Sequence, residues 1–125
     1  MDRRRGVLGL GRIGQEVVKR ARAFGMRCVA FDVYWPEAFA AEYGVERVMT
    51  AEGVLPLADV VTLHMNLTDA NRGFINARTL ATMKRGSYLI NTARGGLVVE
   101  DDVAEACRSG QLAGTAVTAK DLMVQ

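Results

Sequence analysis

Residues 6–14, Gly-Val-Leu-Gly-Leu-Gly-Arg-Ile-Gly, join a short apolar run to a glycine-rich turn near the start of the chain. Gly9, Gly11 and Gly14 fit the spacing G-x-G-x-x-G, which is weak evidence by itself. Here the spacing follows a predicted strand and precedes a predicted helix, and Asp32 ends the next predicted strand. In that context the glycines permit a tight turn, close approach of a phosphate to the backbone, and close helix–strand packing. The stretch therefore predicts a dinucleotide-binding βαβ unit.

The rest of the chain continues the alternation of short apolar runs and helical patterns. We expect strands at residues 6–9, 27–31, 45–48, 59–64, 87–91 and 113–117, and helices at residues 12–24, 36–43, 76–83 and 100–108, with a helical turn interrupted by Pro56 at residues 51–58. In the first helix, Ile13, Val17, Ala21 and Phe24 recur at helical spacing and should form its buried face. Such alternation predicts an α/β Rossmann fold, with a doubly wound parallel sheet of order 3-2-1-4-5-6 and helices on both faces.

Composition limits the possible functions. The chain has 125 residues, the size of one domain, and a net charge of +2, too small to indicate nucleic-acid binding. It has neither an apolar run long enough for a membrane span nor a signal-peptide cleavage site. Cys28 and Cys107 lie far apart and lack metal-ligand spacing. We therefore expect a cytoplasmic protein with reduced thiols and no metal site.

The glycine-rich turn and Asp32 together suggest how a cofactor would be held. The first turn of the helix, with the amides of Arg12 and Ile13, offers unpaired N–H groups and a positive dipole end to a pyrophosphate. Asp32 should accept hydrogen bonds from ribose hydroxyls, and it would repel a 2′-phosphate because residues 33–35 supply no cation. These features predict NAD rather than NADP. The alternative is that the glycines are only turn residues and Asp32 only a strand-end cap.

Other polar groups fall at strand ends that this fold brings together. In an open α/β sheet, ligands bind beyond the carboxyl ends of the strands, where the strand order reverses. The first, fourth and fifth strands end there, the fourth at His64 and the fifth at residues 91–96. One imidazole and one guanidinium, that of Arg94, should therefore face the cofactor crevice.

Three segments of the chain resemble a known family. They are residues 83–96, Met-Lys-Arg-Gly-Ser-Tyr-Leu-Ile-Asn-Thr-Ala-Arg-Gly-Gly; residues 59–68, Asp-Val-Val-Thr-Leu-His-Met-Asn-Leu-Thr; and residues 109–114, Ser-Gly-Gln-Leu-Ala-Gly. They are similar to the signatures of the D-isomer-specific 2-hydroxyacid dehydrogenases, which include phosphoglycerate, glyoxylate/hydroxypyruvate, D-lactate and formate dehydrogenases. The resemblance covers residues 6 to about 114.

The resemblance implies roles for several residues. Arg94 would be the catalytic arginine, binding the substrate carboxylate with its planar fork and polarising the carbonyl that receives hydride. Thr92, Ala93 and Met65 would line the nicotinamide pocket. His64 would lie near the cofactor without being the proton donor. Two alternatives stay open: Arg94 could form a surface salt bridge, and His64 could simply hydrogen-bond a loop.

The sequence departs from the family pattern in ways that bear on activity. Family members have a substrate-binding domain built from both chain ends, and its proton-donating histidine and partner carboxylate have no counterpart here. Thr118 stands where an aspartate helps to hold the nicotinamide, and Asn66 replaces the usual proline. We therefore expect residues 1–125 to form the dinucleotide-binding domain alone, with little or no turnover. The small 2-hydroxy or 2-keto acid substrate would bind only to a full-length parent protein.

Other functions remain compatible with these patterns. The chain could be a non-catalytic NAD(H)-binding module, an inert isolated domain, or another Rossmann enzyme such as a methyltransferase. A methyltransferase would not account for residues 91–96. Helix faces that would pack on a missing domain could be exposed, and from this we expect a homo-oligomer.

Overall fold

The chain alternates strands and helices from end to end. The computed structural model describes residues 3–91 and 95–116. The elements run in the order β1 (Arg4–Leu8), α1 (Arg12–Ala23), β2 (Arg27–Phe31), α2 (Glu37–Tyr43), β3 (Glu46–Arg47), α3 (Ala51–Val54), η1 (Leu55–Leu57), β4 (Val60–Leu63), α4 (Ala77–Leu80), β5 (Ser87–Asn91), η2 (Gly95–Leu97), α5 (Glu100–Ser109) and β6 (Leu112–Ala116).

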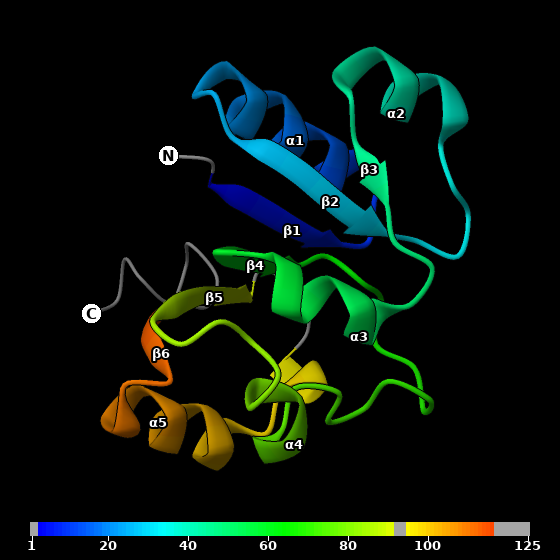
Figure 1. Ribbon diagram of the computed structural model, residues 1–125. Coiled ribbons are helices and arrows are strands. Elements are labelled where there is room, and N and C mark those ends of the chain that lie inside the picture. The colour runs from blue at the N-terminus through cyan, green and yellow to red at the C-terminus, as the bar shows by residue number, and fades with distance from the viewer. Residues whose placement is uncertain (1–2, 92–94, 117–125) are drawn as a thin grey trace.

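The six strands form one parallel sheet of order β3-β2-β1-β4-β5-β6, which confirms the predicted topology. The strand order reverses between β1 and β4, so the carboxyl ends of these two strands meet at the edge where this fold binds ligands. Figure 1 shows α1 and α2 on one side of the sheet, above β1–β3 in the view, and α3, α4 and α5 on the other side.

Two apolar clusters stabilise this three-layer arrangement. The larger cluster lies on the side of α3–α5 and takes side chains from β1, β2, β4, β5 and β6, including Leu8, Leu63 and Leu89. The smaller cluster lies on the side of α1 and α2, and its strand residues come only from β1 and β2. The two sides of the sheet are therefore covered to different extents.

The buried face of α1 differs from the one predicted. Gly14, Val18 and Ala21 are its buried residues, and Val17 is partly buried beside them, whereas Ile13 is 65% exposed and Phe24 is 86% exposed. The prediction that Ile13 and Phe24 pack on the core was wrong. Gly14 has no side chain to register in a hydrophobic pattern, yet it is the point at which the helix lies closest to β1. Sequence periodicity therefore identified Val17 and Ala21 correctly and missed Gly14 and Val18.

Of the shorter helical segments, α4 ends earlier than predicted. Helix α4 begins where predicted, because the Oδ1 atom of Asn76 accepts hydrogen bonds from the amides of Arg78 (2.9 Å) and Thr79 (3.1 Å). It ends at Leu80 rather than Met83, and the amide of Met83 bonds back only three residues, to Leu80. The helical turn predicted at 51–58, interrupted by Pro56, is confirmed as α3 followed by a 3₁₀ turn that contains Pro56 near its start.

The remaining predicted elements agree with the structure to within about two residues. In residues 3–91 and 95–116, no helix combines the length and the apolar composition that crossing a membrane requires.

Candidate functional site

Gly9 makes the turn from β1 toward α1. Its φ angle is +100°, a left-handed conformation that favours glycine, and its amide donates to the carbonyl of Phe31 at 2.9 Å. A Cβ atom at this position would lie 2.7 Å from the backbone carbonyl of His64 and 2.9 Å from the amide of Met65. The structure therefore brings the glycine-rich turn against the segment that follows β4, as the strand order predicted.

Gly11 and Gly14 have opposite surroundings. A Cβ atom on Gly14 would lie 2.1 Å from the carbonyl oxygen of Gly9, so only a glycine allows α1 to start this close to β1. A Cβ atom on Gly11 would meet nothing within 4 Å, and Gly11 itself is exposed. The space above Gly11 is thus open to a ligand, while Gly14 is a packing residue.

The start of α1 is suited to bind an anion. The helix has 12 residues, its N-cap is Gly11, and no side chain caps it. Its first turn contains no acidic residue, whereas the first turn of α5 contains Glu100, Asp101 and Asp102. The first amides of any helix lack intrahelical acceptors and carry a partial positive charge. At α1 neither a cap nor a carboxylate compensates them, so a phosphate could.

Asp32 lies directly after β2 and is joined to the glycine-rich turn. Its Oδ2 atom accepts a hydrogen bond from the amide of Leu10 at 2.5 Å, and its Oδ1 atom accepts one from the amide of Tyr34 at 2.9 Å. Because each carboxylate oxygen can accept a further bond, the side chain can still receive ribose hydroxyls. Asp32 is half-buried, and its carboxylate therefore has a fixed position at the edge of the turn.

A cation that the sequence analysis missed lies near this edge. The guanidinium carbon of Arg47, in β3, lies 5.2 Å from the centre of the Trp35 ring, a cation–π distance. Residues 33–35 supply no cation themselves, but β3 places one beside them. Nothing in the local sequence signals this pair, because the two residues are 12 positions apart and meet only through β2–β3 pairing.

His64 follows β4 and lies at the centre of the carboxyl edge. Its amide donates to the carbonyl of Leu8 at 2.7 Å. Burial, and secondarily the positive charge of Arg5, lowers the pKa of His64 from 6.5 to about 4. The imidazole is therefore neutral at pH 7, and it can accept or donate a hydrogen bond without adding charge to the crevice.

The other predicted site residues divide into two groups. Met65 lies beside Gly9 and packs against the larger apolar cluster. Thr92, Ala93, Arg94 and Thr118 lie outside the described residues. The structure describes β5 as far as Asn91, which pairs with Leu63 of β4.

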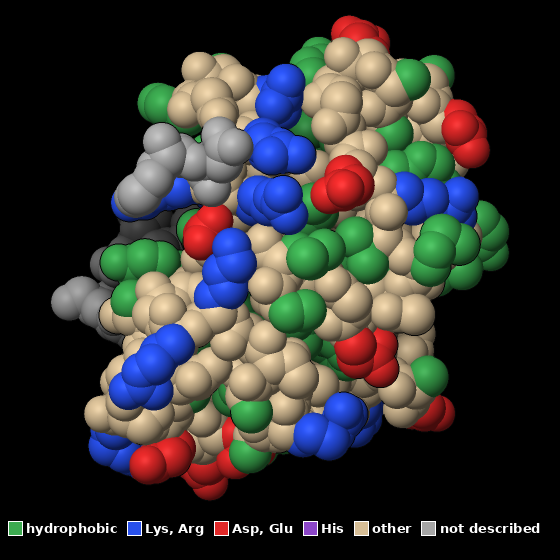
Figure 2. All heavy atoms as spheres, viewed as in Figure 1, with side chains coloured by type: hydrophobic (Ala, Val, Ile, Leu, Met, Phe, Trp, Pro, Cys, Tyr) green, Lys and Arg blue, Asp and Glu red, His purple; other side chains and the backbone are tan. Residues whose placement is uncertain are grey.

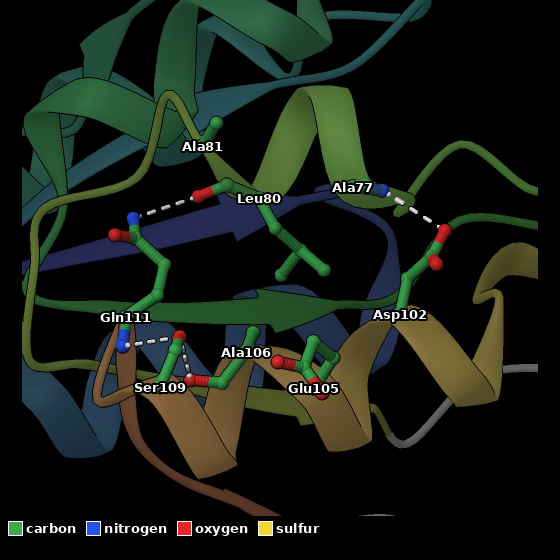
Figure 3. A pocket seen from close by; sticks show the side chains of 8 residues that line it. All are labelled: Ala77, Leu80, Ala81, Asp102, Glu105, Ala106, Ser109 and Gln111. Carbon is green, nitrogen blue, oxygen red and sulfur yellow. Dashed lines mark hydrogen bonds between the residues drawn. The ribbon is translucent and has the colours of Figure 1, made fainter.

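A second hollow lies between α4 and α5, away from this edge (Figure 3). Its polar groups already hold the two helices in place. Gln111 donates from Nε2 to the carbonyls of Leu80 and Met83, both at 2.9 Å, and Asp102 accepts from the amide of Ala77 at 3.0 Å. We therefore regard it as a packing feature. Among residues 3–91 and 95–116, no three His, Cys, Asp or Glu side chains gather as a metal site would require.

The residues present fit a dinucleotide. An uncapped 12-residue helix, open space over Gly11 and a fixed carboxylate at the end of β2 are the features that a pyrophosphate and an adenosine ribose need.

Comparison with known proteins agrees with this fit. Residues 1–120 match the family described as "D-isomer specific 2-hydroxyacid dehydrogenase, NAD binding domain". The D-3-phosphoglycerate dehydrogenase of Methanocaldococcus jannaschii is 44% identical over 112 residues, which are 90% of this chain and 21% of that protein. The chain thus spans about a fifth of the length of this curated relative.

Solved structures of dehydrogenases are also similar to this chain. A formate dehydrogenase from Granulicella has a TM-score of 0.90 and 36% identity, over 93% of this chain and 31% of that one. An NAD-complexed D-isomer specific 2-hydroxyacid dehydrogenase from Lactobacillus delbrueckii ssp. bulgaricus has a TM-score of 0.84 and 33% identity, over 91% of this chain and 34% of that one.

The contrast between Gly14 and Gly11 generates a prediction about stability. Gly14→Ala should lower the free energy of unfolding by about 1–3 kcal/mol or more, because its Cβ would overlap the Gly9 carbonyl. Gly11→Ala should cost less than about 1 kcal/mol, since only the N-cap preference changes. Urea denaturation followed by circular dichroism measures both. Equal losses in the two variants would contradict the assignment of Gly14 as the packing glycine.

His64 generates a prediction about pH. The folded-state pKa of about 4 lies below the ordinary value of 6.5, so between these values the unfolded chain binds the proton more readily. His64 should therefore reduce stability as pH falls from about 6.5 to about 4, and His64→Gln should lose this component in urea denaturation. Because the chain has one histidine, a single imidazole NMR signal reports the titration. A midpoint near 6.5 would show that His64 is not desolvated.

Proposed function

We propose, because the chain belongs to the NAD-binding domain family of the D-isomer-specific 2-hydroxyacid dehydrogenases, that it is the cofactor half of such an enzyme. The parent reaction transfers a hydride between NAD(H) and a small D-2-hydroxy acid or 2-keto acid. The observation that carries the proposal is the start of α1, where uncapped amides lie beside the carboxylate of Asp32. The family match also removes the reason to consider a methyltransferase.

In this proposal the chain holds NAD through three groups. Gly11, Arg12 and Ile13 present backbone to the pyrophosphate, while Gly9 and Gly14 fix the turn and the helix. Asp32 accepts the adenosine ribose hydroxyls and excludes a 2′-phosphate by charge repulsion. Arg47 in β3 is a cation that could oppose this exclusion, but its guanidinium is engaged with the Trp35 ring. Repulsion of a 2′-phosphate by Asp32 therefore outweighs attraction by Arg47, and the site favours NAD over NADP.

The nicotinamide end is proposed to lie beside His64 and Met65. Their place beside Gly9 and at the end of β4 supports this. From the family resemblance we assign Thr92 and Ala93 to the same pocket and Arg94 to the substrate carboxylate. NAD, when bound, supplies the hydride acceptor. Arg94 would orient the substrate and withdraw electrons from its carbonyl group.

We propose that the chain alone does not turn over substrate. Reduction of a keto acid requires a proton for the developing alkoxide, and a positioned acid contributes about 10²–10⁴-fold. With a pKa of about 4, His64 carries no proton to give from an imidazolium at pH 7. The acid and the side-chain pocket for the substrate are assigned to a further domain, and residues 1–125 to the dinucleotide-binding domain.

Compartment and assembly are also proposals. Cys28 and Cys107 are both free thiols, which supports a reducing compartment such as the cytoplasm. Exposed apolar side chains, such as Phe24 and Met49, support self-association into a homo-oligomer.

Asp32 provides the test of the cofactor assignment. Asp32→Asn removes the charge but keeps one acceptor oxygen, so it should weaken NADH binding about 10–100-fold. It should also reduce the difference between the affinities for NADH and NADPH, because the repulsion of a 2′-phosphate is lost. Asp69→Asn, at an exposed aspartate outside the glycine-rich turn, is the matched control. Fluorescence titration measures both affinities. Unchanged NADH affinity in a folded Asp32→Asn variant would refute the ribose assignment.

The proposed lack of turnover needs a separate measurement. The chain is titrated with NADH and then supplied with pyruvate, glyoxylate or hydroxypyruvate, while absorbance at 340 nm is followed. We expect a change in NADH fluorescence and no oxidation. Steady oxidation would show that the chain is a complete catalyst, and absence of any NADH binding would show it to be an inert domain.

A further inference from the structure

A further hollow lies at the amino-terminal edge of the sheet, at the opposite ends of the strands from the proposed dinucleotide edge. Its volume is about 410 Å³, and it is lined by Arg3 before β1, by Asp59 and Val60 at the start of β4, and by residues 84–88 at the start of β5. We call it the basic hollow. Pockets that hold small molecules have volumes of about 300–1,000 Å³, so the basic hollow is large enough for one.

The charges that line the basic hollow do not cancel. Arg3, Lys84 and Arg85 are cationic and exposed, whereas Asp59 is the one carboxylate of the lining. Asp59 is already engaged, because Oδ2 accepts a hydrogen bond from the amide of Arg4 at 2.8 Å and Oδ1 lies 3.4 Å from the Lys84 ammonium. Three cations against one carboxylate give the lining a net charge of +2.

The two guanidinium groups are the cations left for a ligand. Neither Arg3 nor Arg85 forms a salt bridge with any carboxylate in residues 3–91 and 95–116. An Nη2 atom of Arg85 donates to the carbonyl of Ser109 at 2.7 Å, which holds its planar group in place while other N–H groups can still bind an anion. Figure 2 shows a row of Lys and Arg side chains descending the side of the molecule on which β1, β4 and β5 begin.

Ser87 adds a buried hydroxyl to the lining. The residue is 3% exposed, yet its Oγ atom has no hydrogen-bond partner within the described ranges 3–91 and 95–116. A buried hydroxyl without a partner is unfavourable, because it has given up hydrogen bonds to water without replacing them. An anionic oxygen in the basic hollow would give this hydroxyl an acceptor. The orphaned hydroxyl thus points to a ligand independently of the charge.

One wall of the basic hollow is apolar. Tyr88 is 48% exposed, and Val60, its partner in β4, is half-buried. Paired residues of parallel strands point to the same side of the sheet, so the two side chains lie next to each other. The Tyr88 ring therefore offers a flat surface to an apolar group beside the cations.

We propose that the basic hollow binds a small phosphate monoester, whose phosphate meets Arg3, Arg85 and the Ser87 hydroxyl and whose apolar part lies against Tyr88. A phosphate monoester carries about 1.5–2 negative charges at pH 7, which match the net charge of the lining. Arginine forks suit phosphate oxygens in particular. Because this edge and the dinucleotide edge are at opposite ends of the strands, the inference does not depend on the proposed function.

The test uses the full 125-residue chain and phenyl phosphate, a probe that carries both a phosphate and a ring. Backbone amide chemical shifts during the titration should change most at residues 84–88. Phenyl phosphate should also raise the urea midpoint of unfolding, because it binds only the folded chain. Inorganic phosphate, which lacks the ring, should bind more weakly. Saturation with NAD+ should leave the changes at residues 84–88 in place.

Variants separate binding from folding. Arg3→Gln and Arg85→Gln should each weaken phenyl phosphate about tenfold, whereas Arg78→Gln, which removes an exposed arginine of α4 outside the lining, should have no effect. Ser87→Ala should weaken binding severalfold. Without phenyl phosphate, Ser87→Ala should leave the urea midpoint unchanged or raise it, because the hydroxyl that it removes has no partner.

Four results would overturn the proposal. The first is a set of shift changes confined to residues 11–14, which would show that the phosphate binds only at the start of α1. The second is unchanged affinity in folded Arg3→Gln and Arg85→Gln variants. The third is full affinity in Ser87→Ala. The fourth is equal affinity for inorganic phosphate and phenyl phosphate, which would exclude a role for the apolar wall.

Discussion

The close approach of α1 to the carboxyl end of β1 is the constraint on which the whole dinucleotide edge depends. Gly14 lies so near the Gly9 carbonyl that no side chain fits between them. As a result the helix starts directly above the strand end, and its first amides face the crevice at the point where strand order reverses. The Asp32 carboxylate then fixes the outer side of the turn through the amide of Leu10. The packing of Gly14 against Gly9 thus places the helix amides and the Asp32 carboxylate where a dinucleotide would bind.

His64 adds no positive charge where the nicotinamide is proposed to lie. Burial keeps it neutral at pH 7, and the charge of Arg5, which donates to Thr62 in β4, lowers its pKa further. The amides at the start of α1 offer positive potential to the crevice from fixed positions. Fixed dipoles need no reorganisation when a charged ligand binds.

Sequence patterns predicted the sheet and the glycine-rich edge because both depend on local features: apolar strand runs, glycine spacing, and an acid at a strand end. They failed where distant parts of the chain meet. The buried stripe of α1 was misplaced because Gly14 carries no hydrophobic signal, and the Arg47–Trp35 pair was missed because only strand pairing brings it together. The roles of Thr92, Ala93 and Arg94 still rest on the family resemblance.

Backbone amide chemical shifts during titration with NAD+ test the central claim most directly, because they report which N–H groups meet the phosphates. Our account predicts that the largest changes occur at Gly11, Arg12, Ile13 and Gly14, with smaller ones at Leu10 and Tyr34 next to the Asp32 carboxylate. Unchanged amides at the start of α1, in a sample whose other signals move with NAD+, would mean that the cofactor binds elsewhere on the protein.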